Sequence, residues 1–193
     1  MTTRPGGRSA RVRDAVRAAT YAELVEHGYL GLTVENVATR AGVHKTTVYR
    51  RWATIDVLIA DALDHARDTD WPVPDTGTLE GDLIAIADEV VDAFTDPALR
   101  AMPEAIVTAA LHSQRARAAK RDFYAARQAQ AAEVVRRAQR RGELPEGVDA
   151  VELVRLTCAP LYYRIFVTGE PLDHDTARRS ARAALAAARA GVL

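Results

Sequence analysis

The fold of this chain is decided by the segment Leu32-Thr-Val-Glu-Asn-Val-Ala-Thr-Arg-Ala-Gly-Val-His-Lys-Thr-Thr-Val-Tyr-Arg-Arg-Trp52. Its pattern predicts a short helix over residues 34–40 and a second helix over residues 45–52. Thr33 stands where a helix N-cap is expected, because its hydroxyl can accept a hydrogen bond from a free backbone N–H group. Gly42 stands where the chain must turn, and a positive φ costs little only for glycine. The segment therefore predicts a helix, a tight turn and a second helix.

A small apolar core is expected between these two helices. Ala38 is small enough to let the second helix cross closely over the first, and Trp52 is interpreted as a plug of this core. The other side chains expected to fill it are Val37, Ala41, Val43 and Val48. This is the helix-turn-helix layout, in which the second helix enters the major groove of DNA.

The second helix carries side chains that suit duplex DNA. Its cationic, hydroxyl and phenolic donors are Lys45, Thr46, Thr47, Tyr49, Arg50 and Arg51. Such groups bond phosphate oxygens, and arginine and threonine also reach base edges. The charge is unevenly distributed, since residues 1–52 hold nine basic and four acidic side chains while the whole chain holds 26 of each. This asymmetry favours a polyanion as the partner of the N-terminal part.

The rest of the chain also predicts helices, because Val, Ile, Thr and Tyr never gather into alternating runs bounded by turns. A first helix is expected over residues 10–26, ending before Gly28, which suits a C-terminal cap. Two prolines and a glycine in residues 70–77 stop any helix there. Pro160 lies inside one of the later helices and predicts a kink. The further helices are expected over residues 54–67, 79–93, 114–140, 149–168 and 174–190, with shorter pieces bounded by Pro97 and Pro103.

The composition excludes several classes of protein. The chain has 193 residues, 48% hydrophobic and 27% charged, which suffices for a buried core and a polar surface. Its single cysteine, Cys158, excludes an internal disulfide framework and a cysteine-based zinc site, and favours a reducing, cytoplasmic location. No apolar run approaches the ~18 residues that a membrane span needs, so no membrane partner is expected. Residues 1–9 lack the apolar stretch of a secretion signal and are expected to form a flexible basic arm.

Residues 10–67 resemble the DNA-binding domain of the TetR family of bacterial transcriptional regulators. The resemblance rests on the combined spacing of Glu26-His-Gly-Tyr29, Leu32-Thr-Val34, Val37-Ala38, Arg40-Ala-Gly-Val43, Lys45, Thr47, Tyr49-Arg50 and Leu58. It implies an all-α homodimer whose N-terminal three-helix helix-turn-helix domain, here residues 10–53, binds a palindromic operator in double-stranded DNA. It also implies a larger helical domain, here residues 54–193, for dimerisation and for a small-molecule effector. Repression is the usual mode of the family.

The resemblance also implies roles for single residues at the DNA. The corresponding phosphate contacts are Thr33, Lys45, Thr47 and Tyr49, the base readers are His44, Thr46 and Arg50, and Arg51 completes the set. The chain departs from the family at Thr46, where glycine is frequent, and at Ile55, where lysine is frequent, so Thr54 is expected to replace that lysine. In the alternative interpretation, Thr33 and Tyr49 only cap and pack, and His44 has no role in DNA binding.

In the second domain, two helix faces predict the dimer interface, because apolar residues at spacings of three and four suit helix pairing. These faces consist of Val151, Val154, Cys158, Leu161 and Ile165 on one helix and of Ala177, Ala181, Ala184, Leu185 and Ala188 on the other. A largely apolar effector is expected in a pocket lined by Phe94, Met102, Ile106, Phe123, Tyr124 and Tyr162, with His112 and Arg127 as polar anchors. In the alternative interpretation, one of the faces packs within its own subunit and the aromatic residues only fill the core.

Enzyme functions find little support in the sequence. No two of the five histidines lie three or four residues apart, which excludes the usual pair of helical histidine ligands. Asp61, His65 and Asp68 share one helix face, which we interpret as a solvated, mutually paired surface rather than a metal site. Cys158 lies on an apolar face and is expected to be an inert thiol. We therefore expect a regulator without cofactor or metal; the alternatives are a helical dimerisation or adaptor protein without DNA binding, and a metal-dependent helical enzyme.

Overall fold

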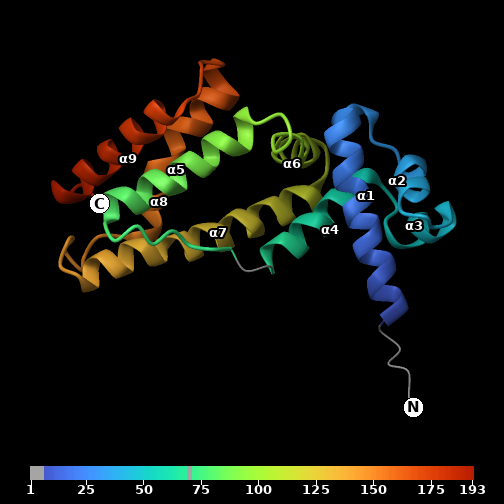
Figure 1. Ribbon diagram of the computed structural model, residues 1–193, viewed down its shortest axis with the longest axis horizontal. Helices are drawn as coiled ribbons and strands as arrows, with labels where there is room; N and C mark the ends of the chain where they lie inside the picture. The colour runs from blue at the N-terminus through green and yellow to red at the C-terminus, as the bar shows by residue number, and fades with distance from the viewer. Residues whose placement is uncertain (1–6, 69–70) are drawn as a thin grey trace, which may run out of the picture. The chain divides into compact units, whose positions relative to one another are not determined.

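The structure, a computed structural model, describes residues 7–68 and 71–193 of the chain. Within these residues every regular element is a helix (Figure 1), which confirms the predicted all-α fold. The chain divides into two compact units. Of the described residues, unit 1 holds 7–68 and 97–123, and unit 2 holds 71–96 and 124–193. Each unit is therefore built from segments that are distant in the sequence.

Unit 1 begins with α1 (Gly7–Gly31), which is longer than the helix predicted over residues 10–26. The predicted end is still visible in the backbone, because Gly28 has a φ of 66° and a ψ of −178° and so interrupts the helix. At its other end α1 takes up the last three residues of the predicted arm. The remainder of that arm, residues 1–6, lies outside the described residues.

The predicted helix-turn-helix is formed by α2 (Val34–Arg40) and α3 (Lys45–Arg51). Thr33 is the N-cap of α2, and its hydroxyl oxygen accepts a hydrogen bond from the backbone N–H of Asn36 at 3.1 Å. Gly42 makes the turn with a φ of 64°. Both local predictions are confirmed. The bounds of α2 also agree with the prediction, while α3 ends one residue earlier than expected.

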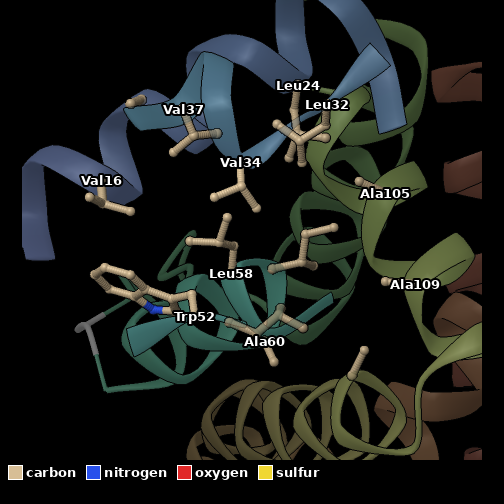
Figure 2. Close-up of a cluster of buried hydrophobic side chains, with 14 of the residues drawn as sticks. Val16, Leu24, Leu32, Val34, Val37, Trp52, Leu58, Ala60, Ala105 and Ala109 are labelled. Atoms are coloured by element: carbon tan, nitrogen blue, oxygen red, sulfur yellow. The ribbon is translucent and has the colours of Figure 1, made fainter. Parts of the chain in front are cut away.

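One hydrophobic core holds these two helices against α1, α4 (Ile55–Arg67) and α6 (Ala101–His112). Figure 2 shows Trp52, Val37 and Leu58 within this cluster. Trp52 is only 2% exposed, which confirms its predicted role as a plug of the core. The side chains predicted to lie between the two helices all belong to this core, namely Val37, Ala38, Ala41, Val43 and Val48. The helix α4, predicted to open the second domain, packs within unit 1.

Unit 2 is built from α5 (Leu79–Thr95), α8 (Ala150–Tyr163), the π-helical turn η1 (Arg164–Thr168) and α9 (His174–Arg189). The long helix α7 (Gln114–Arg140), whose bounds agree with the prediction, contributes residues to both units, because the division falls within it. The core of unit 2 is formed where apolar side chains of α5, α7, α8 and α9 meet.

The helix predicted over residues 149–168 is divided between α8 and η1. Pro160 lies inside α8 and cannot donate a backbone hydrogen bond. After Tyr163 the hydrogen bonding widens to the π-helical pattern, in which the N–H of Gly169 donates to the carbonyl oxygen of Arg164 at 2.8 Å. The departure from regular α-helix thus follows the proline by about one turn.

The structure corrects the predicted dimer interface only in part, since α9 packs through one face against α5 and α8 of its own chain (Figure 1). Seven of the predicted interface residues are buried within the chain: Val154, Leu161, Ala177, Ala181, Ala184, Leu185 and Ala188. Their exposure is 2% or less, so no surface is left for a partner. For these residues the alternative interpretation, packing within the subunit, is the one that the structure supports. Val151, Cys158 and Ile165 keep part of their surface exposed.

The buried indole of Trp52 yields a stability prediction. We expect Trp52→Ala to lower the free energy of unfolding by about 3–5 kcal/mol, because it removes the largest fully buried side chain and leaves a cavity. Urea unfolding followed by circular dichroism measures this change. The matched control is Leu30→Ala, since Leu30 is 95% exposed and its truncation should change the free energy of unfolding by less than about 0.5 kcal/mol. Equal effects of the two substitutions would contradict the assigned core.

His174 yields a prediction about pH. Its Nδ1 lies 2.8 Å from an oxygen of Asp88 and its Nε2 lies 3.4 Å from Asp92, and the hydrogen bond to Asp88 raises the pKa of His174 above 6.5. A raised pKa in the folded state means that the contribution to stability is complete below pH 6.5 and is lost as the pH rises through the folded pKa. The difference in unfolding free energy between the wild type and His174→Gln should therefore shrink from pH 6 to pH 8. Parallel curves over this range would show that the pairing contributes nothing.

Candidate nucleic-acid interface

The helix α3 turns one face toward the core of unit 1 and the other toward the exterior. On the inner face Val48 is fully buried, and Thr47 is half-buried beside it. The exposed side chains of the helix are Lys45, Thr46, Tyr49, Arg50 and Arg51. With 3.6 residues per turn, a helix of seven residues makes about two turns, so these donors lie close together. All the donors that the sequence predicted on this helix, other than Thr47, are thus at the surface.

The imidazole of His44 caps α3. His44 is the N-cap residue, and its Nδ1 accepts a hydrogen bond from the backbone N–H of Thr46 at 3.4 Å and lies 2.8 Å from the hydroxyl of Thr46. The two predicted base readers at this end of the helix are therefore paired with each other. Their contact with bases stays a prediction, while the capping role of His44 is visible in the geometry.

Tyr49 is paired with an acid that the sequence analysis did not single out. Its hydroxyl donates to an oxygen of Glu35 in α2 at 2.8 Å, and the side chain is 44% exposed. This hydrogen bond raises the pKa of Tyr49 and, from the other side, lowers the pKa of Glu35. The nearby charge of Lys45 lowers the pKa of Glu35 further. The one feature of the sequence that could have pointed to this pair is that Glu35 is the single acid between Leu32 and Trp52.

Arg51 is engaged with the start of α1. Its guanidinium donates to the hydroxyl of Ser9 at 2.9 Å and to the carbonyl oxygen of Ser9 at 3.4 Å. The same group lies 5.5 Å from the ring centre of Trp52, within the range of a cation–π contact. Arg51, predicted as a DNA contact, therefore joins the C-terminal end of α3 to the first turns of α1 in this structure.

The remaining residues that were predicted to contact DNA differ in their hydrogen bonds and ion pairs within the chain. Thr33 uses its hydroxyl to cap α2 and is exposed beside it. Lys45 and Arg50 are exposed, and neither takes part in an ion pair within 4.0 Å among the residues that the structure describes. These two cations are therefore available to an anionic partner without first breaking an internal ion pair.

A buried carboxylate joins α2 to α1. Glu23 is 4% exposed and accepts a hydrogen bond from the guanidinium of Arg40, which also bonds Glu26. The Nε2 of His27 lies 3.8 Å from the second oxygen of Glu23. Because an unpaired buried charge costs several kcal/mol, Arg40 stabilises the position of α2 on α1. Sequence reasoning missed this pair, since nothing in the pattern distinguishes Glu23 from a solvated acid.

The predicted effector residues are distributed over both units. Met102, Ile106 and Phe123 pack against the core of unit 1, and His112 is exposed at the end of α6. In unit 2, the ring of Tyr162 lies 6.0 Å from that of Phe94 and 6.1 Å from that of Tyr124, both nearly perpendicular to it. Arg127 lies 5.8 Å from the ring centre of Trp71. The structure thus brings Phe94, Tyr124 and Tyr162 together as an aromatic cluster, and it places Arg127 over Trp71.

Trp71 and Arg127 also have polar partners. The indole N–H of Trp71 donates to Glu89 at 2.9 Å, and Arg127 donates to Gln130 at 3.1 Å. Burial raises the pKa of Glu89, and it also raises the pKa values of Tyr124 and Tyr162. The sequence analysis missed Trp71 and Glu89, because they precede the predicted pocket residues in the chain and only folding places them beside Arg127.

Two further kinds of residue were singled out from the sequence, the potential metal ligands and the cysteine. No group of three or more histidine, cysteine, aspartate or glutamate side chains there could hold a metal ion. Asp61 and Asp68, which the sequence places on one helix face with His65, both pair with arginine. Asp61 lies 2.8 Å from Arg17, and Asp68 lies 3.0 Å from Arg67. Burial raises the pKa of the Cys158 thiol to about 12, as expected of an inert cysteine.

Among the described residues, none of the helices combines the length and the apolar character that crossing a membrane requires.

Comparison with known proteins identifies relatives over both units. The family model described as "Bacterial regulatory proteins, tetR family" matches residues 16–62, and that described as "Tetracyclin repressor-like, C-terminal domain" matches residues 73–184. The HTH-type transcriptional regulator AqdR of Rhodococcus erythropolis is 34% identical, over 88% of this chain and 80% of its own. The DNA-binding transcriptional repressor TetR of Mycobacteroides abscessus is 41% identical over 44% of this chain and 43% of its own.

A solved structure agrees with this relationship. The crystal structure of the TetR family transcription regulator SCO0332 superimposes with a TM-score of 0.73 at 30% identity, covering 91% of this chain and 97% of that one.

Proposed function

Because the chain belongs to the tetR family of bacterial regulatory proteins, and is therefore a DNA-binding transcriptional regulator rather than an enzyme, we propose that it acts as a homodimeric repressor. In this proposal two copies of α3 bind the half-sites of a palindromic operator in the cytoplasm, and a small, largely apolar effector releases them. The description of the Mycobacteroides abscessus relative as a repressor supports this mode of action.

The observation that carries the proposal is the exposed cationic face of α3. The opposite side of this helix is held in the core by the buried side chains of Val48 and Trp52. We assign DNA binding to residues 10–53, and dimerisation and effector binding to residues 54–193. Lys45, with Thr33, Thr47 and Tyr49, contacts phosphates in this proposal, while Arg50, with His44 and Thr46, reads bases. Arg51 is assigned the fixing of α3 to α1 in the unbound protein, because its guanidinium is already bonded to Ser9.

A dimer follows from the geometry of operators, since half-sites lie roughly 34–36 Å apart and each needs its own recognition helix. Large apolar side chains are exposed at the end of α8 and in η1: Tyr163, Phe166 and Val167 are 57%, 46% and 66% exposed. Exposed apolar side chains next to one another are typical of association surfaces. We propose that this segment, with the partly exposed Ile165, forms part of the dimer interface.

We place the effector beside the aromatic cluster of unit 2, formed by Phe94, Tyr124, Tyr162 and Phe166. Their ring faces suit an apolar or aromatic ligand, and Arg127 supplies a polar anchor. Release from the operator then requires that the effector binds more tightly to an arrangement of the two subunits in which the recognition helices do not match the half-sites.

The test of DNA binding uses the DNA upstream of the protein's own gene. The wild type should shift this duplex in a gel at concentrations that leave a mixed-sequence duplex of equal length free. Lys45→Ala should weaken binding to all duplexes, and it should reduce the slope of log K against log salt by about 1, as expected for loss of one phosphate contact. The matched control is Lys120→Ala in α7, the only other lysine of the chain, which should leave both quantities unchanged. An unchanged salt slope for Lys45→Ala would refute its assigned contact.

The dimer interface has its own test. Val167→Asp should raise the dimer dissociation constant about tenfold or more, because it places a charge in an apolar contact. Sedimentation velocity over a range of protein concentrations measures this constant. Leu111→Asp is the control, since Leu111 is 70% exposed in unit 1, outside the proposed interface. If both variants dimerise like the wild type, the interface lies elsewhere.

A further inference from the structure

The carboxylate of Glu35 lies among groups to which the proposed function gives a role at the DNA backbone. It accepts the hydrogen bond of the Tyr49 hydroxyl at 2.8 Å, and it lies close enough to Lys45 for their charges to interact. Glu35 and Tyr49 are both exposed, so the carboxylate occupies the outer surface of the helix-turn-helix rather than its core. An anion is therefore already bound to Tyr49, one of the donors that are assigned to phosphate.

The hydroxyl of Tyr49 cannot serve two anions at once. A phenol carries one proton and donates one hydrogen bond, whereas a carboxylate and a DNA phosphate both act only as acceptors. A phosphate that takes the hydrogen bond of Tyr49 must therefore first separate it from Glu35. The carboxylate and the phosphate also repel each other, since both are negative and would lie beside the same hydroxyl.

We propose that the Glu35 carboxylate stands in for one DNA phosphate in the unbound protein and limits the affinity of the helix-turn-helix for any duplex. Binding of DNA then includes an exchange, in which the phosphate replaces the carboxylate as the partner of Tyr49. This proposal rests on the proposed function, because it needs Tyr49 and Lys45 to face the DNA backbone. In this proposal Glu35 weakens the binding of DNA, whereas the surrounding cations strengthen it.

The first measurement is the affinity of Glu35→Gln for a fluorescein-labelled 30-base-pair duplex of mixed sequence, read by anisotropy at several salt concentrations. Glutamine keeps the size of the side chain and removes its charge. We expect binding about three- to tenfold tighter than that of the wild type near 0.1 M salt, as for one additional effective phosphate contact. The matched control is Glu104→Gln, because Glu104 is also an exposed acid in the first turn of a helix, in α6 of the same unit. This control changes the net charge equally and should leave affinity unchanged.

The second measurement tests whether Glu35 acts through Tyr49. In the wild type, Tyr49→Phe should change the affinity little, because the hydroxyl must leave Glu35 before it can bond a phosphate. In the Glu35→Gln background, the same substitution should weaken binding about fivefold, because the hydroxyl then bonds phosphate without an ionised competitor. Thermal unfolding of all four proteins shows whether each remains folded at the temperature of the assay.

The outcomes separate this proposal from the proposed function. If the wild type binds DNA and Glu35→Gln binds equally well or more weakly, the carboxylate does not compete with phosphate and the proposal is overturned. Equal effects of Tyr49→Phe in the two backgrounds would overturn it as well. If neither the wild type nor any variant binds a duplex, the proposed function itself fails, and this proposal fails with it.

Discussion

The structure of the candidate DNA-binding surface depends on the burial of two side chains, Val48 and Trp52. The helix α3 has only seven residues, and a helix of that length has little stability on its own. It keeps its place because Val48 is fully buried and Trp52 is 2% exposed in the core shared with α1, α2 and α4. The outward direction of Lys45 and Arg50 follows from this packing, since residues on the two faces of one helix are fixed together.

The parts of the fold that local rules determine were predictable from the sequence. A hydroxyl at Thr33, a positive φ at Gly42 and an interruption at Gly28 each follow from the chemistry of one residue and its immediate neighbours. The partner of an apolar helix face does not follow in this way. The spacing of Ala177, Ala181 and their neighbours indicates that the face is buried, but it contains no information on whether a second subunit or α5 and α8 cover it.

In the candidate site, too, local features could be predicted from the sequence, and contacts between distant residues could not. The sequence predicted which residues of α3 could bond DNA, because their chemistry is sufficient for that argument. It did not predict what holds them in the unbound protein. The hydrogen bond from Tyr49 spans 14 residues to Glu35, and the bonds from Arg51 span 42 residues to Ser9. Such pairings can be predicted only when the packing of α1, α2 and α3 is known.

The chemistry of Cys158 has a practical consequence. Burial raises the pKa of its thiol to about 12 and so disfavours the thiolate at neutral pH, which is the form that reacts with maleimides and oxidants. We therefore expect the single native sulfhydryl to react slowly with alkylating dyes. A cysteine introduced at an exposed position could be labelled selectively without first replacing the natural one, which opens the molecule to distance measurements between paired fluorophores or spin labels.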